Sequence, residues 1–436
     1  MTQKKHTKSK KSNICRDNGL NFEECELFIL RQNVDNIEEN QNKKITNSPE
    51  VKKLLSIVET FIRKNNLISY GGQAINAVLP SYDKFYNKDV DLPDWDCYDA
   101  DALNHAKELC DIFYKEGFEE VESKSGQHHG TYKVFVNFIP VLDLTYIPKD
   151  LFNTIKKDAV RINGILYSPV NLLRMNMFLE LSRPAGDVSR WEKVLKRLVL
   201  LNKNFPLNPK QCSTINFQRT MSDQTEGDKI YDTIQNALIM NGVVFFGGYA
   251  ISRYAQYMPH NIRKSFEKIP DFDVLSEEPL ETAEIIKERL NDIDVKNVKI
   301  VQHPPVGEIL SSHYEIRVGK DTVAFIYEPL ACHSYNVLQE GGHEIKIATI
   351  DTMLSFYLAF LYANRPYYDI DRIICMSKYL FEVQERNRLA QKGLLKRFSI
   401  NCIGHQETVE EMRAQKTEKF KELKDKRGST EYEEWF

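Results

Sequence analysis

The sequence predicts an α/β (α+β) fold in which one small mixed-sheet module with flanking helices is built twice in tandem. A Gly-Gly-x-Ala-Ile string occurs at Gly71–Ile75 and again at Gly247–Ile251, each time after a short apolar run. An Asp-x-Asp pair follows about 22 residues later in both copies, at Asp94–Asp96 and at Asp271–Asp273. At 436 residues the chain is long enough for two such modules.

The elements of the two copies follow one another in the same order. Apolar periodicity predicts helices over 21–38 and 48–66, and the second begins with Ser48 as N-cap and Pro49 at the first helical position. Apolar runs at 67–70 and 243–246 predict strands before each Gly-Gly turn. Further predictions are helices over 100–117 and 280–293, strands over 132–138, 134–145 and 314–318, and later helices before Arg183-Pro184 and Arg365-Pro366.

We therefore predict four segments. They are a basic tail with a helical N-terminal segment (1–46), a catalytic module (47–206), a degenerate copy of that module (207–385) and a charged helical segment (386–436). The first twelve residues include five lysines, and residues 413–427 include seven basic and three acidic residues. Both stretches are typical of solvated surfaces, and RNA contact is the alternative.

Composition excludes several classes of protein. Hydrophobic residues make up 42 % and charged residues 28 %, which is typical of globular chains rather than collagen-like or disordered ones. No apolar stretch reaches the length of a membrane span, and the basic N-terminus is not followed by an apolar segment, so we expect a cytosolic compartment. The eight cysteines are scattered singly, which predicts reduced thiols without disulfides or structural zinc. A net charge of −3 does not indicate a nucleic-acid binder.

Three aspartates are the candidate catalytic and metal-binding residues. Side chains alternate along a strand, so Asp94 and Asp96 point to one face while Trp95 points to the other. Asp143 lies in an apolar strand, where an unpaired buried carboxylate would cost several kcal/mol. Three converging carboxylates suit Mg²⁺ or Mn²⁺, and two such ions can assist an in-line displacement at phosphorus.

The Gly-Gly turn is the candidate phosphate site. Gly71 and Gly72 follow a strand and open a helix, where backbone N–H groups favour an anion, and Gln73 is the next residue. Two surfaces remain open to more than one reading. Arg190, Lys193 and Arg197 share one helix face, which is either solvated or in contact with triphosphate or RNA. His128-His129 lies in a predicted hairpin loop and is a weak metal signal.

Four segments together resemble the polymerase-β type nucleotidyltransferase core. They are Gly71–Asn76, Pro93–Asp96, Gly130–Asn137 and Asp143–Ile147. More narrowly, they are similar to the catalytic subunits of viral poly(A) polymerases from poxviruses, asfarviruses and amoebal giant viruses. Residues 181–202 resemble the giant-virus members in particular, and the likeness covers most of residues 60–380. One departure is Gly72, where the general fingerprint of these transferases has serine.

The resemblance implies template-independent addition of AMP from ATP to RNA 3′ ends, with release of pyrophosphate. It assigns two Mg²⁺ or Mn²⁺ ions to Asp94, Asp96 and Asp143. From the Gly-Gly turn and the basic helix face, nucleotide binding is expected at Gly71, Gly72, Gln73, Arg190 and Lys193. It also implies a homodimer, or a heterodimer with a processivity subunit, in the host cytoplasm, at the viral factory, and in the virion. The alternatives are a nucleotidyltransferase with another NTP or acceptor, and a non-catalytic RNA-binding or processivity subunit.

The second copy is predicted to lack catalysis. Asp143 lies eleven residues after Tyr132, and the residue eleven after Tyr314 is Phe325. Glu328 could replace the missing carboxylate only after a change of strand register. Copy two is therefore expected to support the fold or to frame an RNA or subunit surface.

Overall fold

The computed structural model describes residues 19–87, 89–209, 212–215, 217, 221, 227–266, 272–387 and 389–436. The chain forms two compact units. One comprises Met1–Val58 with Phe85–Pro93, and the other comprises Glu59–Lys84 with Asp94–Phe436. Within the described ranges, no helix is both long and apolar enough to cross a bilayer.

The smaller unit contains α2 (Phe22–Thr46) and most of α3 (Pro49–Asn65). A capping box between Asn21 and Glu24 begins α2, and the Ser48 hydroxyl accepts a hydrogen bond from the Val51 amide at the start of α3. Both predicted helices are confirmed, and α2 runs eight residues beyond the predicted end at 38. The predicted basic tail, the first twelve residues, lies outside the described residues.

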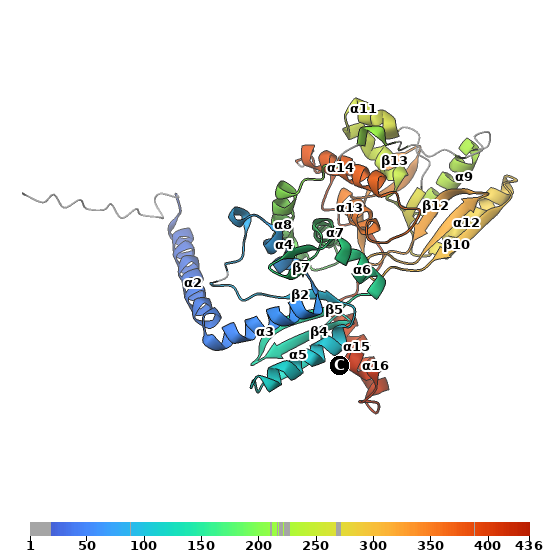
Figure 1. Ribbon diagram of the computed structural model, residues 1–436. Helices are drawn as coiled ribbons and strands as arrows, with labels where there is room; N and C mark the ends of the chain where they lie inside the picture. Colours follow the sequence, from blue (N-terminus) through green and yellow to red (C-terminus); the bar gives the residue numbers. More distant parts are fainter. Residues whose placement is uncertain are drawn as a thin grey trace, which may run out of the picture. The chain divides into compact units, whose positions relative to one another are not determined.

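The larger unit contains two mixed sheets (Figure 1). The first has seven strands in the order β3-β4-β5-β2-β1-β7-β6. Its strands are β1 (Ile68–Tyr70), β2 (Asp96–Asp99), β3 (Val121–Ser125), β4 (Thr131–Val136), β5 (Ile139–Tyr146), β6 (Val160–Ile162) and β7 (Ile165–Tyr167). The helices around it are α4 (Gly71–Val78), α5 (Ala102–Lys115), α6 (Lys149–Asp158), α7 (Val170–Leu181) and α8 (Trp191–Asn204).

The second sheet has eight strands in the order β10-β11-β12-β9-β8-β14-β13-β15. They are β8 (Val244–Phe245), β9 (Phe272–Leu275), β10 (Val298–His303), β11 (His313–Val318), β12 (Asp321–Tyr327), β13 (His333–Glu340), β14 (His343–Ala348) and β15 (Cys402–Ile403). The later helices are α9 (Gly227–Met240), α10 (Gly248–Tyr254), α11 (His260–Arg263), α12 (Pro279–Asp292), α13 (Ile350–Phe360), α14 (Ile370–Arg386), α15 (Val409–Leu423) and α16 (Thr430–Trp435).

The two sheets repeat one strand order. In the first sheet β4-β5-β2-β1-β7 are neighbours, and in the second β11-β12-β9-β8-β14 are neighbours in the same sequence. Helix α7 packs on α13, the corresponding helix of the other copy, so equivalent elements face each other in the core. The predicted mixed α/β class is therefore confirmed, whereas the boundaries at 47–206 and 207–385 stay predictions.

Two sequence-based expectations are wrong. The stretch 134–145 is not one strand, because Asn137 and Phe138 adopt positive φ angles of 49° and 63° and turn the chain from β4 into β5. The cysteines are not all reduced: Cys212 is bonded to Cys375 and Cys332 to Cys402. Their partners are 163 and 70 residues apart in sequence, so spacing gave no indication of either pair.

Candidate active site

The Gly-Gly turn joins β1 to α4 and lies against an aspartate. Gly71 is the first residue of α4 and has a φ of +68°, a conformation that glycine adopts at little cost. A Cβ atom there would stand 2.7 Å from Oδ2 of Asp96, closer than real side chains allow. No side chain caps the start of α4, which leaves the first-turn amides of Gly72 and Gln73 to another acceptor. Both residues are half-buried.

Asp96 and Asp143 are direct neighbours across the sheet. Strands β2 and β5 run parallel, Asp96 is paired with Asp143, and the Asp143 amide donates a 2.8 Å hydrogen bond to the Trp95 carbonyl. On its other side β2 pairs antiparallel with β1, which places Tyr70 opposite Asp96. Two carboxylates and the Gly-Gly turn are thus brought together by three adjacent strands. This juxtaposition depends entirely on long-range strand pairing.

Asp94 precedes β2 and is exposed, whereas Trp95 is buried with 5 % of its surface accessible. The alternation that places Trp95 on the reverse side therefore continues to Asp94, even though the regular strand begins only at Asp96. The charge of Asp94 raises the pKa values of both Asp96 and Asp143, so its carboxylate belongs to the same electrostatic cluster.

Burial and mutual repulsion disfavour the ionised form of this cluster. Burial, followed by the charges of Asp94 and Asp143, raises the pKa of Asp96 to about 7. Burial also raises the pKa of Asp143, against the opposing effect of Lys133. The raised pKa of Asp96 indicates that the positive charges of Lys133 and Arg190 do not fully offset burial and the neighbouring carboxylates.

Lys133 belongs to the site, although the sequence alone did not predict it as a site residue. It lies on β4 directly opposite Asp143, and its ammonium group donates to Oδ2 of Asp143. Once β4 and β5 are recognised as a hairpin, cross-strand pairing would have indicated this contact. Lys133 also lowers the pKa of Asp96, so its charge acts on two of the three carboxylates.

Arg190, a member of the predicted basic face, acts electrostatically on Asp96. It ends the short helix Val188–Arg190 before α8, and its Nε lies 3.3 Å from Oε1 of Glu180. Its positive charge lowers the pKa of Asp96, although more weakly than Lys133 does. Lys193 is exposed in the first turn of α8, and Arg197 lies one turn further along and is half-buried. In the described part of the chain, no hydrogen bond or ion pair joins Lys193 to the three carboxylates.

The donor set fits a hard divalent cation. Three carboxylates supply oxygen ligands, and the raised pKa of Asp96 shows that added positive charge would stabilise its ionised form. Across the described ranges, however, no three acidic, histidine or cysteine side chains lie in a ready-made ligand arrangement. Asp143 is engaged by the ammonium group of Lys133 instead.

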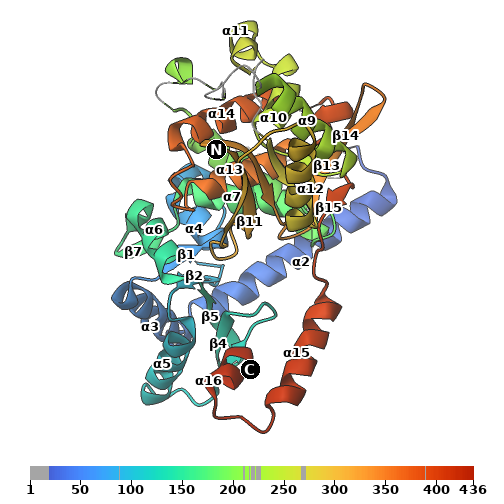
Figure 2. The same ribbon diagram turned by 90° about the vertical axis from the view of Figure 1, so that its right-hand side faces the viewer.

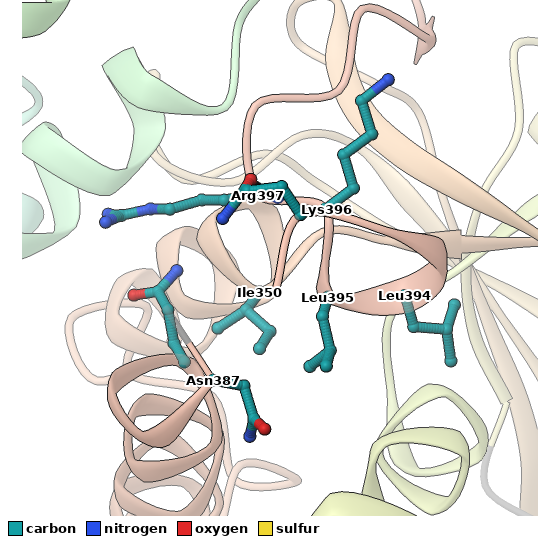
Figure 3. Close-up of a pocket in the computed structure, with 8 residues that line it drawn as sticks. Ile350, Asn387, Leu394, Leu395, Lys396 and Arg397 are labelled. Carbon is teal, nitrogen blue, oxygen red and sulfur yellow. Dashed lines mark hydrogen bonds between the residues drawn. The ribbon is translucent and has the colours of Figure 1, made fainter. Parts of the chain in front are cut away.

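His128 and His129 lie in the loop between β3 and β4, as predicted. The ring of His129 packs at 4.4 Å from that of Trp435, near the end of α16. Figure 3 shows a further small cavity, away from the aspartates. It is lined by Ile350, Gln384, Asn387, Gln391, Leu394, Leu395, Lys396 and Arg397. Its Arg397 pairs with the buried Asp351, which assigns these residues to packing of the second sheet.

The second copy keeps the turn but replaces the charges. Phe325 is paired with Asp273 exactly where Asp143 is paired with Asp96, and Glu315 occupies the place of Lys133. Arg317 donates two hydrogen bonds to Glu315, so that carboxylate is already neutralised. Glu328 follows the end of β12 and is exposed, and Asp271 lies outside the described residues. One described carboxylate, Asp273, thus remains at the position of the first-copy pair.

Three comparisons found known proteins that are similar to this chain in sequence or in fold. The family model for the poly(A) polymerase catalytic subunit matches residues 56–187, which include all three aspartates. A protein of Acanthamoeba polyphaga mimivirus, named a candidate poly(A) polymerase catalytic subunit, is 30 % identical over 168 residues, or 36 % of this chain and 27 % of that protein. Its counterpart in African swine fever virus (strain Badajoz 1971 Vero-adapted) is 31 % identical over 184 residues, or 41 % and 39 %.

The fold extends the similarity beyond the matched segment. The crystal structure of the Megavirus polyadenylate synthase superposes with a TM-score of 0.76 and 19 % sequence identity, covering 99 % of this chain and 86 % of that one. The matched sequence spans only about a quarter to two fifths of the curated relatives. The resemblance to viral poly(A) polymerase catalytic subunits is therefore confirmed, in sequence over residues 56–187 and in fold over nearly the whole chain.

Proposed function

We propose that the chain is a polynucleotide adenylyltransferase that adds AMP from ATP to RNA 3′ ends. The observation that supports this most directly is the pairing of Asp96 with Asp143 beside the Gly71 turn. A turn with uncapped amides offers a phosphate site, and the adjacent carboxylates offer ligands for divalent cations. The family match over residues 56–187 supports this reaction over others that such a site could serve.

The residues of the site divide the work of the reaction. Amides at the start of α4 would hold the triphosphate, because Gly71 and Gly72 let it approach the backbone. Asp94, Asp96 and Asp143 would hold two Mg²⁺ or Mn²⁺ ions, which activate the attacking 3′ hydroxyl and stabilise the leaving pyrophosphate. Arg190 would offset the charge that builds up on the phosphates.

Lys133 would change partner during this cycle. Its ammonium group now contacts Asp143, and that carboxylate must be released to serve as a ligand. The freed lysine lies on the same strand face and remains close to any anion bound there. The positive charge of Lys133 thus offsets part of the negative charge of the three aspartates.

Partners and location follow from the relatives. The relatives are named as catalytic subunits of poly(A) polymerases, and from this we infer an RNA 3′ end and ATP as substrates and a homodimer or a processivity partner. Because they are viral proteins, we place this chain in the host cytoplasm at the site of viral transcription, and in the virion.

The test is primer extension with each of the four labelled NTPs and Mg²⁺. We expect incorporation from ATP above the other three, and near-complete loss in the variants Asp94→Ala and Asp96→Ala. Equal use of all four NTPs would contradict the poly(A) assignment and favour a less selective nucleotidyltransferase. RNA binding without incorporation of any nucleotide, unchanged by Asp96→Ala, would favour the non-catalytic subunit.

A further inference from the structure

The C-terminal segment 404–436 leaves the second sheet and packs on the first. It starts directly after β15, whose Cys402 is bonded to Cys332 and whose backbone pairs with β13. Its amide at Gly404 donates to Glu277, 3.1 Å away. Gly404 has a φ of +94°, and a Cβ atom there would clash with the carbonyl of Ala331, so the backbone path is fixed at this point. The root of the segment is thus fastened to the second sheet.

Helix α15 then fastens to the loop between β3 and β4. Lys416 is half-buried, and its ammonium group donates to the carbonyl oxygens of Ser125 and Gly126 at 3.0 and 2.9 Å. These carbonyls lie where β3 ends and the hairpin loop begins. One side chain therefore holds two backbone groups of an edge strand that has a neighbour on only one side.

Helix α16 lies beside β4 (Figure 2). It makes three contacts around the same loop. The ring of Trp435 packs on His129, the carbonyl of Glu434 accepts a 3.4 Å hydrogen bond from the hydroxyl of Tyr132, and Glu433 pairs with Lys107 of α5 at 2.6 Å. Tyr132 is only 4 % exposed. Lys107 belongs to α5, the helix that packs on β3 and β4. The C-terminal segment therefore contacts both these strands and the helix that covers them.

The hairpin so held carries one side of the candidate active site. Tyr132 immediately precedes Lys133, which lies opposite Asp143 on β5. A register shift between Val134 and Phe135 interrupts the β4–β5 ladder just beyond this pair. Such an irregularity loosens the local pairing, so the position of Lys133 depends more on what packs around Tyr132.

We propose that residues 404–436 form a strap that connects the second sheet to strands β3, β4 and β5 of the first sheet. The strap holds these three strands, and hence Asp143, in position, with Lys416 and Trp435 as positioning residues. This inference rests on the proposed function, because it takes Asp143 to be a metal ligand. It gives the second copy a part in the reaction that needs no metal site of its own. The strap thus connects the second copy, in which Phe325 replaces one carboxylate of the cross-strand pair, to the first copy, which has the Asp96–Asp143 pair.

The test measures metal affinity separately from catalysis. Mn²⁺ is titrated into the full-length protein without nucleotide, and hydrogen exchange is followed over residues 121–146. We expect Lys416→Met and Trp435→Ala to weaken Mn²⁺ binding by about tenfold, the lower end of what outer-shell partners of metal ligands contribute, and to speed exchange in the hairpin. Lys416→Arg and Trp435→Phe keep the donor and the ring and should retain most of the affinity.

Two controls separate the possible failures. Lys421→Met removes the same charge from an exposed position of α15 and should leave both readouts unchanged. If Lys416→Met matches Lys421→Met in Mn²⁺ affinity, the strap has no positioning role and the proposal is wrong. Asp143→Asn tests the underlying function: if this variant binds Mn²⁺ as tightly as the parent, the metal assignment itself fails. A loss in Asp143→Asn without a loss in Lys416→Met overturns the strap alone.

Discussion

Replacing Gly71 by alanine tests the close approach between the Gly-Gly turn and Asp96. The new Cβ would lie 2.7 Å from Oδ2 of Asp96, whereas ordinary contacts begin at 3.4 Å, so the carboxylate must retreat by about 0.7 Å, the difference between the two. The positive φ of 68° adds about 1–2 kcal/mol of backbone strain. Misplacement by about 1 Å can cost about 100-fold in rate, so we expect a 10- to 100-fold loss of kcat.

Gly117→Ala is the matched control for that experiment. Gly117 has a φ of +91°, and a Cβ atom there would meet nothing within 4 Å. This variant should show similar strain, measured as a lower free energy of unfolding, while keeping kcat and Mn²⁺ affinity. Urea unfolding and adenylate incorporation are measured on both variants. If Gly71→Ala loses stability but keeps full kcat, the contact between the turn and Asp96 has no part in catalysis.

Three further predictions concern the charges. Asp273→Ala should leave incorporation within about twofold of the parent, because Phe325 stands where a second carboxylate would be needed; a loss like that of Asp96→Ala would show that copy two is active. Because the pKa of Asp96 is raised from 3.8 to about 7, the folded protein holds a proton there that the unfolded chain releases. The contribution of Asp96 to the free energy of unfolding is fully present below pH 3.8 and is lost as the pH rises through 7. The total loss is at most about 4 kcal/mol. Unfolding without metal should therefore depend more steeply on pH in the parent than in Asp96→Asn, and Mn²⁺ should stabilise the parent more at pH 8 than at pH 6; parallel pH curves would contradict this. Arg190→Met should move the acid limb of the kcat/KM profile to higher pH, because Arg190 lowers the pKa of Asp96, and an unmoved limb would remove Arg190 from the site.

Local patterns were sufficient to predict the arrangement around the Gly-Gly turn. Strand β1, the turn at Gly71 and the start of α4 lie within a few residues of one another, and each has a local signal. The alternation of Asp94, Trp95 and Asp96 is also local. Spacing alone was enough to align Phe325 with Asp143, because each lies eleven residues after its tyrosine and each pairs with the second aspartate of its Asp-x-Asp motif.

What the sequence could not show depends on pairing across long distances. Lys133 was read as part of a motif, but its contact with Asp143 requires the register of a hairpin whose turn at Asn137 was missed. Asn137 is itself a residue type that tolerates positive φ, so a signal was present. The disulfides and the docking of α15 carry no local signal, because their partners are up to about 300 residues apart.

The contact between Tyr132 and Glu434 can form only late in translation. The two residues are 302 positions apart in the chain. At roughly 5–20 residues per second, the ribosome reaches Glu434 about 15 to 60 s after Tyr132. During that interval the carbonyl groups of Ser125 and Gly126 and the hydroxyl of Tyr132 lack the partners that the C-terminal helices supply, at a sheet edge where wrong pairing or chaperone binding can occur. The aspartate cluster would mature late in translation, although most of its strands emerge early.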